Sequence, residues 1–180
     1  PTSNQYTNQQ SLELNATSSD VDNDVLNYSY YINGILNQTS LTNTTLNASD
    51  GYYILNVSIS DGIATTANAT VNFTIDRIAP VVNTTFNITS PGLNDIINFT
   101  GNVTDSGGLL SANITYNMSG ILTKVNFTLS GTSAQVSNAT RLECEETCVI
   151  NFTMYATDTS NNVKQNSTLI TVADTTKPVV

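Results

Sequence analysis

Apolar and polar residues alternate with a period of two along most of this chain. In residues 97–104, Ile97, Phe99 and Val103 stand at alternate positions with asparagine and threonine between them. The same alternation recurs at three further places, in residues 12–17, 68–75 and 150–157. Successive side chains of a β-strand point to opposite faces, so this pattern predicts strands with one buried and one solvated face. No long stretch has the 3.6-residue spacing of an amphipathic helix.

Turn signals separate the predicted strands. Six glycine-containing dipeptides fall between the alternating segments: Asn33-Gly34, Asp50-Gly51, Asp61-Gly62, Gly107-Gly108, Ser119-Gly120 and Ser130-Gly131. Such dipeptides are typical of tight turns between strands. Many short strands with frequent turns indicate an all-β fold of the sandwich type.

The chain contains an internal repeat, which predicts two domains. The segment LNYSYYINGIL (26–36) aligns with ANITYNMSGIL (112–122), and IDRIAPVV (75–82) aligns with ADTTKPVV (173–180). We therefore expect domain 1 at residues 1–78 and domain 2 at residues 79–176. Residues 177–180 then form a linker that begins a next domain in a longer array, or a strand donated to another subunit.

Acceptor triplets for N-linked sugar are far more frequent than chance predicts. Randomly ordered, the 25 asparagines and 47 serines and threonines would give about six or seven Asn-x-Ser/Thr triplets in 180 residues. The chain has eighteen, beginning at Asn15, Asn27, Asn37, Asn43, Asn47, Asn56, Asn68, Asn72, Asn83, Asn87, Asn98, Asn102, Asn113, Asn117, Asn126, Asn138, Asn151 and Asn166. The middle residue is apolar in fourteen of them. In a strand this residue enters the core, so asparagine and threonine face solvent. We expect most of these asparagines to be glycosylated; the alternative is a polar surface without sugar.

Several segments resemble immunoglobulin-like repeats of bacterial and archaeal surface proteins. The junctions Asp-Arg-Ile-Ala-Pro-Val-Val and Asp-Thr-Thr-Lys-Pro-Val-Val are similar to their linkers, and residues 50–62 look like the late strand of a polycystic-kidney-disease-type domain. Tyr53 stands where such folds place a corner tyrosine. The resemblance implies two tandem Ig-like antiparallel β-sandwich domains. The density of acceptor triplets further resembles that of N-glycosylated archaeal surface proteins and extracellular filaments.

Charge and composition argue against several classes of function. The chain has 14 acidic and 5 basic residues, a net charge of −9 and no histidine. This balance disfavours nucleic acid and anionic membrane surfaces as partners. No run reaches the ~18 apolar residues of a membrane span, so we expect no membrane insertion within this chain. Without histidine there is no Ser-His-Asp or Cys-His arrangement, and we expect no enzymatic activity.

Cys144 and Cys148 are the only cysteines. In an exported protein they are expected to pair and to fix a turn before the strand at 150–156. The alternative, a zinc site, would require about four ligands and has only two candidates here.

The one candidate metal site is Asp20-Val21-Asp22-Asn23-Asp24. Asp20, Asp22 and Asp24 alternate as in calcium loops, yet the glycine and the distal glutamate of an EF-hand are missing. The alternative is a polar turn in which these side chains bond their own backbone. Apart from this calcium and the covalent glycans, we expect no cofactor.

The sequence thus predicts a structural subunit of an N-glycosylated fibre outside the cell or on its surface. Its partner would be itself, through strand donation or tandem linkage. Two alternatives remain open: an adhesin or ligand-binding module, and a non-catalytic spacer of a secreted enzyme.

Overall fold

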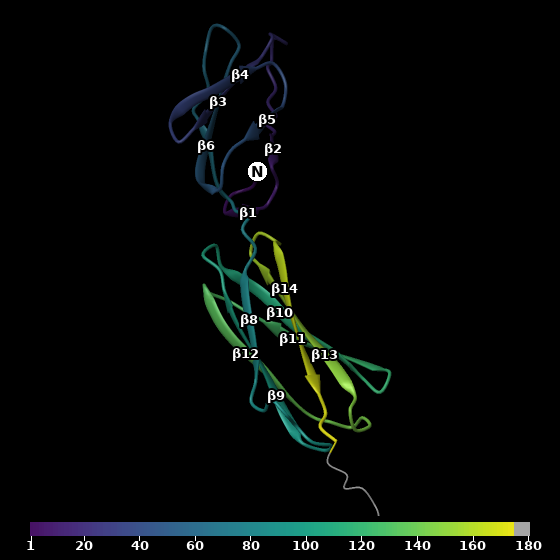
Figure 1. The fold of residues 1–180 in the computed structure, drawn as a ribbon. Coiled ribbons are helices and arrows are strands. Elements are labelled where there is room, and N and C mark those ends of the chain that lie inside the picture. Colours follow the sequence, from purple (N-terminus) through teal and green to yellow (C-terminus); the bar gives the residue numbers. More distant parts are fainter. Residues whose placement is uncertain (175–180) are drawn as a thin grey trace, which may run out of the picture. The chain divides into compact units, whose positions relative to one another are not determined.

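A computed structural model of the chain describes residues 1–174, which form fourteen β-strands and no α-helix. The chain divides into two compact units, unit 1 from Pro1 to Arg77 and unit 2 from Ile78 onward (Figure 1). This division lies one residue before the boundary expected from the repeat. The segment 177–180 lies outside the described residues. Nowhere in residues 1–174 is there a helix with the length and apolarity to cross a membrane.

Unit 1 consists of a five-stranded and a two-stranded sheet. The large sheet has the order β1-β7-β6-β3-β4, formed by Gln5–Thr7, Ala69–Ile75, Gly51–Ser60, Asn27–Ile32 and Ile35–Ser40. The small sheet pairs β2 (Ser11–Leu14) with β5 (Thr44–Asn47). All pairs are antiparallel except β1 with β7, which run parallel. The predicted antiparallel β-sandwich is therefore confirmed, with one parallel pair at its first strand.

The core of unit 1 lies between these two sheets. The small sheet contributes Leu12, Leu14 and Leu46, and the large sheet contributes Tyr30, Leu55, Val57, Phe73 and Ile75. Each of these side chains is at most 7% exposed. Complete burial of one such side chain stabilises a fold by roughly 1.5–3 kcal/mol.

Unit 2 is an antiparallel sandwich of four and three strands. The first sheet has the order β11-β10-β13-β14, formed by Ile121–Thr128, Leu109–Met118, Val149–Asp158 and Val163–Thr171. The second has the order β12-β9-β8, formed by Ser133–Arg141, Ile96–Thr104 and Val81–Phe86. Every pair in both sheets is antiparallel, as the sequence predicts.

The core of unit 2 is larger and is centred on aromatic side chains. Sixteen buried residues form it, against eight in unit 1. Phe152 lies 4.6 Å from Tyr116, 5.3 Å from Phe86 and 5.4 Å from Phe99, measured between ring centroids. Gly101 lets Met154 pack directly against the backbone of β9, because a β-carbon at position 101 would overlap the Met154 sulphur.

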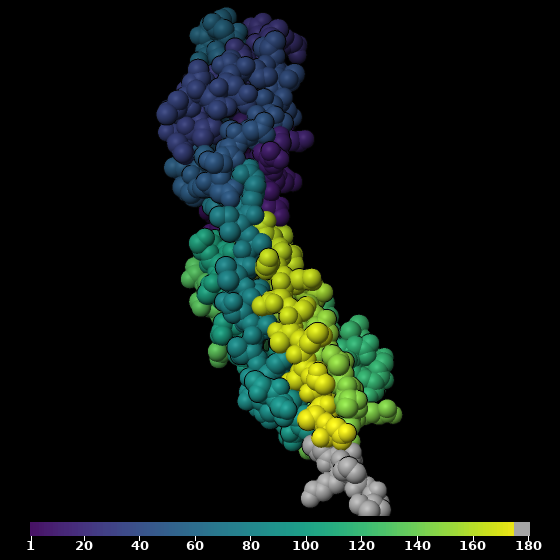
Figure 2. Space-filling view, viewed as in Figure 1, coloured from purple at the N-terminus to yellow at the C-terminus, as the bar shows by residue number. Residues whose placement is uncertain are grey.

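The first strand of unit 2 also lies against the last one. Figure 2 shows β8 in teal and β14 in yellow side by side on one face of the unit. Asn166 Nδ2 of β14 donates to the Val82 carbonyl at 3.0 Å, and the Thr84 and Thr168 hydroxyls bond at 2.8 Å. These side-chain bonds join the two sheets at this edge.

Candidate functional site

The eighteen acceptor asparagines all lie outside the two cores. Twelve are exposed and six are half-buried: Asn56, Asn72, Asn98, Asn113, Asn138 and Asn166. Of the fourteen apolar middle residues, eleven are buried in a core or pack against it: Ala16, Tyr28, Ala48, Val57, Phe73, Phe99, Val103, Ile114, Met118, Phe127 and Phe152. The alternation predicted from the triplets is therefore confirmed for most of them.

Two triplets have the opposite orientation. On β12, Asn138 shares a face with buried Val136, and the exposed residue is Ala139. The next residue on that face, Thr140, accepts a hydrogen bond from the buried Tyr116 of the opposite sheet at 3.3 Å. Asn166 is likewise turned toward β8 by its bond to the Val82 carbonyl. A sugar attached to Asn138 or Asn166 would contact neighbouring protein atoms before it reached solvent.

Acceptor asparagines of unit 2 also stand side by side on neighbouring strands. Asn113 is directly opposite Asn126 in the β10–β11 register, and Asn83 is opposite Asn102 in the β8–β9 register. Directly opposed residues in antiparallel strands have Cα atoms about 4.5–5.5 Å apart. Two glycans at such a pair would compete for the same space above the sheet.

The predicted disulfide is present between Cys144 and Cys148, with Cα atoms 6.3 Å apart. It lies in the connection between β12 and β13. The Cys148 carbonyl accepts a bond from Val172 N, and Thr147 N donates to the Val172 carbonyl, both at 3.0 Å. The disulfide therefore holds a loop that is also bonded to the last core residue of unit 2.

The equivalent connection of unit 1, between β5 and β6, is fastened by the predicted corner tyrosine. Tyr53 donates its hydroxyl hydrogen to the Ser49 carbonyl at 2.8 Å. Its ring stacks on Phe73 at 5.6 Å between centroids. The tyrosine thus joins a surface loop to the core.

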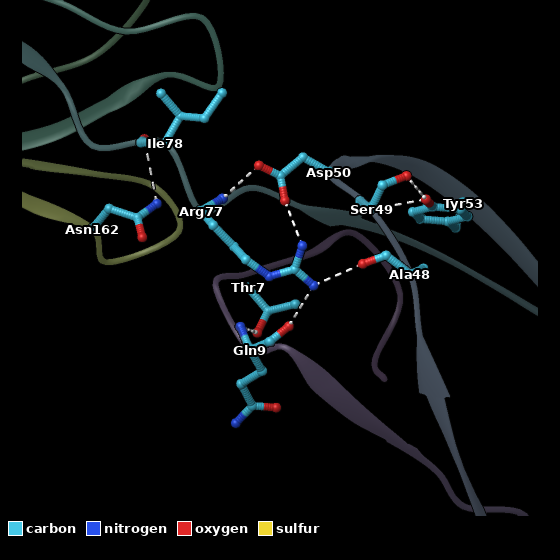
Figure 3. Close-up of polar contacts among 9 residues, drawn as sticks. All are labelled: Thr7, Gln9, Ala48, Ser49, Asp50, Tyr53, Arg77, Ile78 and Asn162. Carbon is cyan, nitrogen blue, oxygen red and sulfur yellow. Dashed lines mark hydrogen bonds and ion pairs between the residues drawn. The ribbon is translucent and has the colours of Figure 1, made fainter.

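Arg77 gathers three segments at the end of unit 1 (Figure 3). Its guanidinium pairs with Asp50 at 2.7 Å and donates to the carbonyls of Ala48 at 2.8 Å and Gln9 at 3.3 Å. Its backbone N–H also donates to Asp50 at 3.2 Å. Arginine suits this role because its planar group carries five donors in a fixed geometry. Sequence reasoning missed Arg77; the only available signal was an arginine directly after a strand in a chain with few basic residues.

The three aspartates proposed as calcium ligands do not converge. Within residues 1–174, Asp20, Asp22 and Asp24 form no group whose carboxylates could share one ion. The Asp20 carboxylate instead accepts the Asp22 backbone N–H at 2.8 Å. This bond is of the kind that the polar-turn alternative predicts, and calcium binding stays a prediction.

Two other carboxylates in unit 2 were not anticipated. Asp105 and Asp158 are buried, with carboxylate oxygens within 4.8 Å of each other. Asp105 accepts the backbone N–H groups of Gly107 and Gly108, and Asp158 accepts both the backbone and the side-chain N–H of Asn162. These bonds close the β9–β10 and β13–β14 turns. They therefore give both aspartates a structural role.

Strand β2 of unit 1 has an edge that no other strand of residues 1–174 covers, unlike the equivalent strand of unit 2. In unit 2, β9 is covered by β12 on one side and by β8 on the other. In unit 1, β2 occupies the same place but pairs with β5 alone, because the first strand has joined β7. A groove runs beside β2, lined on one side by Ser11, Leu12 and Glu13 and on the other by residues of the segment 1–9. An uncovered edge beside a groove can accept an added strand.

Comparison with known proteins identifies no family. No family model and no curated protein matches the sequence. Among solved structures, the chain is similar to the chicken CNTN1 FN1–FN3 domains, with 8% identity, a TM-score of 0.42, and 96% of this chain and 69% of that one covered. It is also similar to the chicken interferon gamma receptor alpha chain, with 12% identity, a TM-score of 0.35 and 95% of each chain covered. A third similarity is to the SGBP-B protein of the Bacteroides ovatus mixed-linkage glucan utilization locus, in complex with a heptasaccharide. Its identity is 11% and its TM-score 0.37, with 96% of this chain and 43% of that one covered. These similarities carry no functional assignment, and the tandem of two Ig-like β-sandwiches follows from the strand order of the chain itself.

Proposed function

We propose that this chain is a structural module of an extracellular or cell-surface fibre whose outer faces carry N-linked glycans. The observation that carries the proposal is the position of the acceptor triplets. None of the eighteen asparagines is buried, while most of their apolar middle residues pack into a core. One short motif thus supplies both the core and the modified surface. The disulfide supports an oxidising compartment outside the cytosol.

Glycans would also supply surface hydration, which the few charged residues supply only in part. Only 11% of the residues are charged, so the surface depends on uncharged polar groups for its hydration. Sugars on both sheets of each unit would add hydration and would cover strand edges that could otherwise pair with other chains.

Glycopeptide mass spectrometry of the native protein tests this proposal. We expect occupancy at most of the eighteen sites and the lowest occupancy at Asn138 and Asn166, since both are turned toward the protein. Mostly unmodified asparagines would contradict the glycan coat and would leave a polar surface in its place.

We propose further that copies of the chain associate by strand addition at the edge of β2. Pro178-Val179-Val180 repeat Pro80-Val81-Val82, and Val81-Val82 begin β8, which covers β9 in unit 2. The same short sequence from a second copy would therefore fit the equivalent uncovered edge in unit 1.

Replacing both Val179 and Val180 with aspartate tests this assembly, with Thr175→Asp as a control for added charge. We expect the double variant to abolish fibres seen by electron microscopy while the far-UV circular dichroism stays unchanged. Fibres that persist in the double variant would favour covalent tandem linkage. Separate strands with a distinct head in native material would favour a spacer or adhesin stalk.

A further inference from the structure

We infer that Tyr155 is a binding platform for the first sugar ring of an N-glycan on Asn113, on the outer face of the β11-β10-β13-β14 sheet. The inference rests on the proposed glycosylation and adds to it a specific non-covalent site. It assigns a ligand, a pyranose ring, to a groove on this face.

The strand register brings the two residues together. Asn113 on β10 is directly opposite Tyr155 on β13. Met154 and Ala156 are fully buried, so Tyr155 between them points away from the core. Asn113 lies between buried Ala112 and Ile114 and points to the same side. Both side chains are half-buried on this outer face.

A shallow groove surrounds this pair. Asn113, Thr115, Lys124, Tyr155 and Thr157 line it, together with two aliphatic side chains. The groove therefore combines one aromatic ring, two hydroxyls and one ammonium group. A sugar ring attached to Asn113 would begin inside this groove.

The chemistry of the groove fits a pyranose. One face of such a ring presents C–H groups, which pack on the electron-rich face of an aromatic side chain, while its hydroxyls project from the rim. Thr115, Thr157 and Lys124 can bond these hydroxyls from the floor and walls. Among residues 1–174 the Tyr155 ring has no aromatic neighbour, whereas the inward-facing Tyr116 and Phe152 stack on each other.

In unit 1, Tyr31 is likewise directly opposite an acceptor asparagine, Asn56, but the Asn56 side-chain oxygen already accepts the Thr70 hydroxyl at 2.9 Å. Asn126 is one strand farther from Tyr155 and does not line the groove. In unit 1, Tyr52 is 58% exposed, but its hydroxyl accepts the side-chain N–H of Asn72 at 3.1 Å. The Asn72 carbonyl oxygen in turn accepts bonds from Ser3 and Asn4. Tyr52 and Asn72 are therefore bonded to protein, while Tyr155 and Asn113 face an open groove.

A double-mutant cycle on the glycosylated chain tests the inference. Tyr155→Thr and Asn113→Gln are made singly and together, and urea unfolding of unit 2 is measured for each. We expect the two changes to be coupled by about three- to tenfold in the unfolding equilibrium constant, as is usual for side chains in contact. Asn126→Gln, which also removes one glycan, is the matched control and should show no coupling with Tyr155→Thr. The same Asn113 cycle on protein from a host without N-glycosylation should also show none.

Occupancy at Asn113 is first measured by glycopeptide mass spectrometry, in the wild-type chain and in Tyr155→Thr. An unmodified Asn113 would overturn both the inference and the proposed glycosylation at this site. An occupied Asn113 without coupling to Tyr155 would overturn the stacking alone and leave the glycan coat standing. Coupling that persists in the unglycosylated protein would show a protein–protein contact and would equally overturn the inference.

Discussion

The two units fasten the same corner of the sandwich with different chemistry. In unit 1 the connection from β5 to β6 is held by hydrogen bonds between the Tyr53 hydroxyl and Ser49 and by the Arg77 cluster around Asp50. In unit 2 the connection from β12 to β13 is longer and is held by the Cys144–Cys148 disulfide. A longer connection has more backbone freedom to restrict, so a covalent closure contributes more there than a hydrogen bond would. Both units therefore hold this connection against the sandwich, and each does so with different side chains.

The units differ as well in where their first strand pairs. Strand β8 joins the three-stranded sheet of unit 2, whereas β1 leaves the equivalent sheet of unit 1 and joins β7. The small sheet of unit 1 is left with two strands and four residue pairs. Because two-stranded sheets are marginally stable alone, β2 and β5 depend on their buried leucines. We therefore expect unit 1 to be the less stable unit and to unfold first in urea.

The largest change is expected from Phe152→Ala. Phe152 is fully buried and contacts three aromatic rings, so its truncation should cost about 3–5 kcal/mol. The loss should move the unfolding transition of unit 2 to or below that of unit 1, as followed by chemical denaturation. Tyr52→Ala, at an exposed site, is the control. A shift confined to the transition of unit 1 would contradict the assignment of the two cores.

Opening the disulfide with Cys144→Ser and Cys148→Ser together should have the next largest effect. The closed loop is short, so the chain-entropy estimate is about 2 kcal/mol. Only unit 2 should be affected, and the effect should vanish when wild type and variant are compared under reducing conditions. Equal stabilities in oxidising buffer would show that the backbone bonds of Thr147 and Val172 hold the loop without the disulfide.

Tyr53→Phe should weaken the corner of unit 1 by about 1 kcal/mol, the usual net value of one hydrogen bond. The ring and its stacking on Phe73 are retained, so the change isolates the hydroxyl. Thermal unfolding of unit 1 is the measurement, and unit 2 in the same sample is the internal reference. No change in unit 1 would mean that Arg77 alone holds the corner.

The smallest effect, and the one of opposite sign, is expected from Tyr30→Phe. Within residues 1–174 the buried Tyr30 hydroxyl has no hydrogen-bond partner, so its removal should stabilise unit 1 by up to about 1 kcal/mol at neutral pH. Burial, with a smaller contribution from Tyr28, raises the pKa of Tyr30 above its ordinary value.

The raised pKa also predicts a dependence on pH. The unfolded chain ionises Tyr30 near pH 10 while the folded chain keeps it neutral, so its contribution to stability is complete below that pH and is lost as pH rises further. Tyr30→Phe should therefore make unit 1 more resistant to alkali, as measured by unfolding between pH 9 and 12. Identical alkaline unfolding of both proteins would contradict a buried, neutral hydroxyl.

The sequence predicts this fold well where one strand face is buried. The period-two pattern around Phe99 and Phe152 gives the correct inward face, because burial of large apolar groups outweighs other preferences there. The corner role of Tyr53 is predicted from the resemblance of residues 50–62 to a strand of Ig-like domains. The pattern fails at Asn138 and Asn166, which lie on β12 and β14 at the margins of their sheets. A polar side chain can point inward at a margin, since a backbone carbonyl or solvent can satisfy it.

The sequence does not predict which strand the first strand pairs with, nor which side chains from distant segments meet. Nothing in Gln5-Tyr6-Thr7 distinguishes a strand beside β7 from one beside β2, since both edges accept a short polar strand. The Arg77 cluster joins residues up to 68 positions apart, and the sequence gives no measure of their proximity. The register of Asn113 with Tyr155 likewise depends on how two distant strands align.

The parallel pairing of β1 with β7 has a mechanical consequence for a fibre. These are the first and last strands of unit 1, and they run in the same direction as neighbours. Tension at the two ends of the unit would load their backbone bonds in shear, so that the bonds share the force and break together. In unit 2 the first and last strands belong to different sheets and are joined by side chains alone. Under tension, the terminal strands of unit 1 would then resist separation more than those of unit 2, although unit 1 has the smaller core.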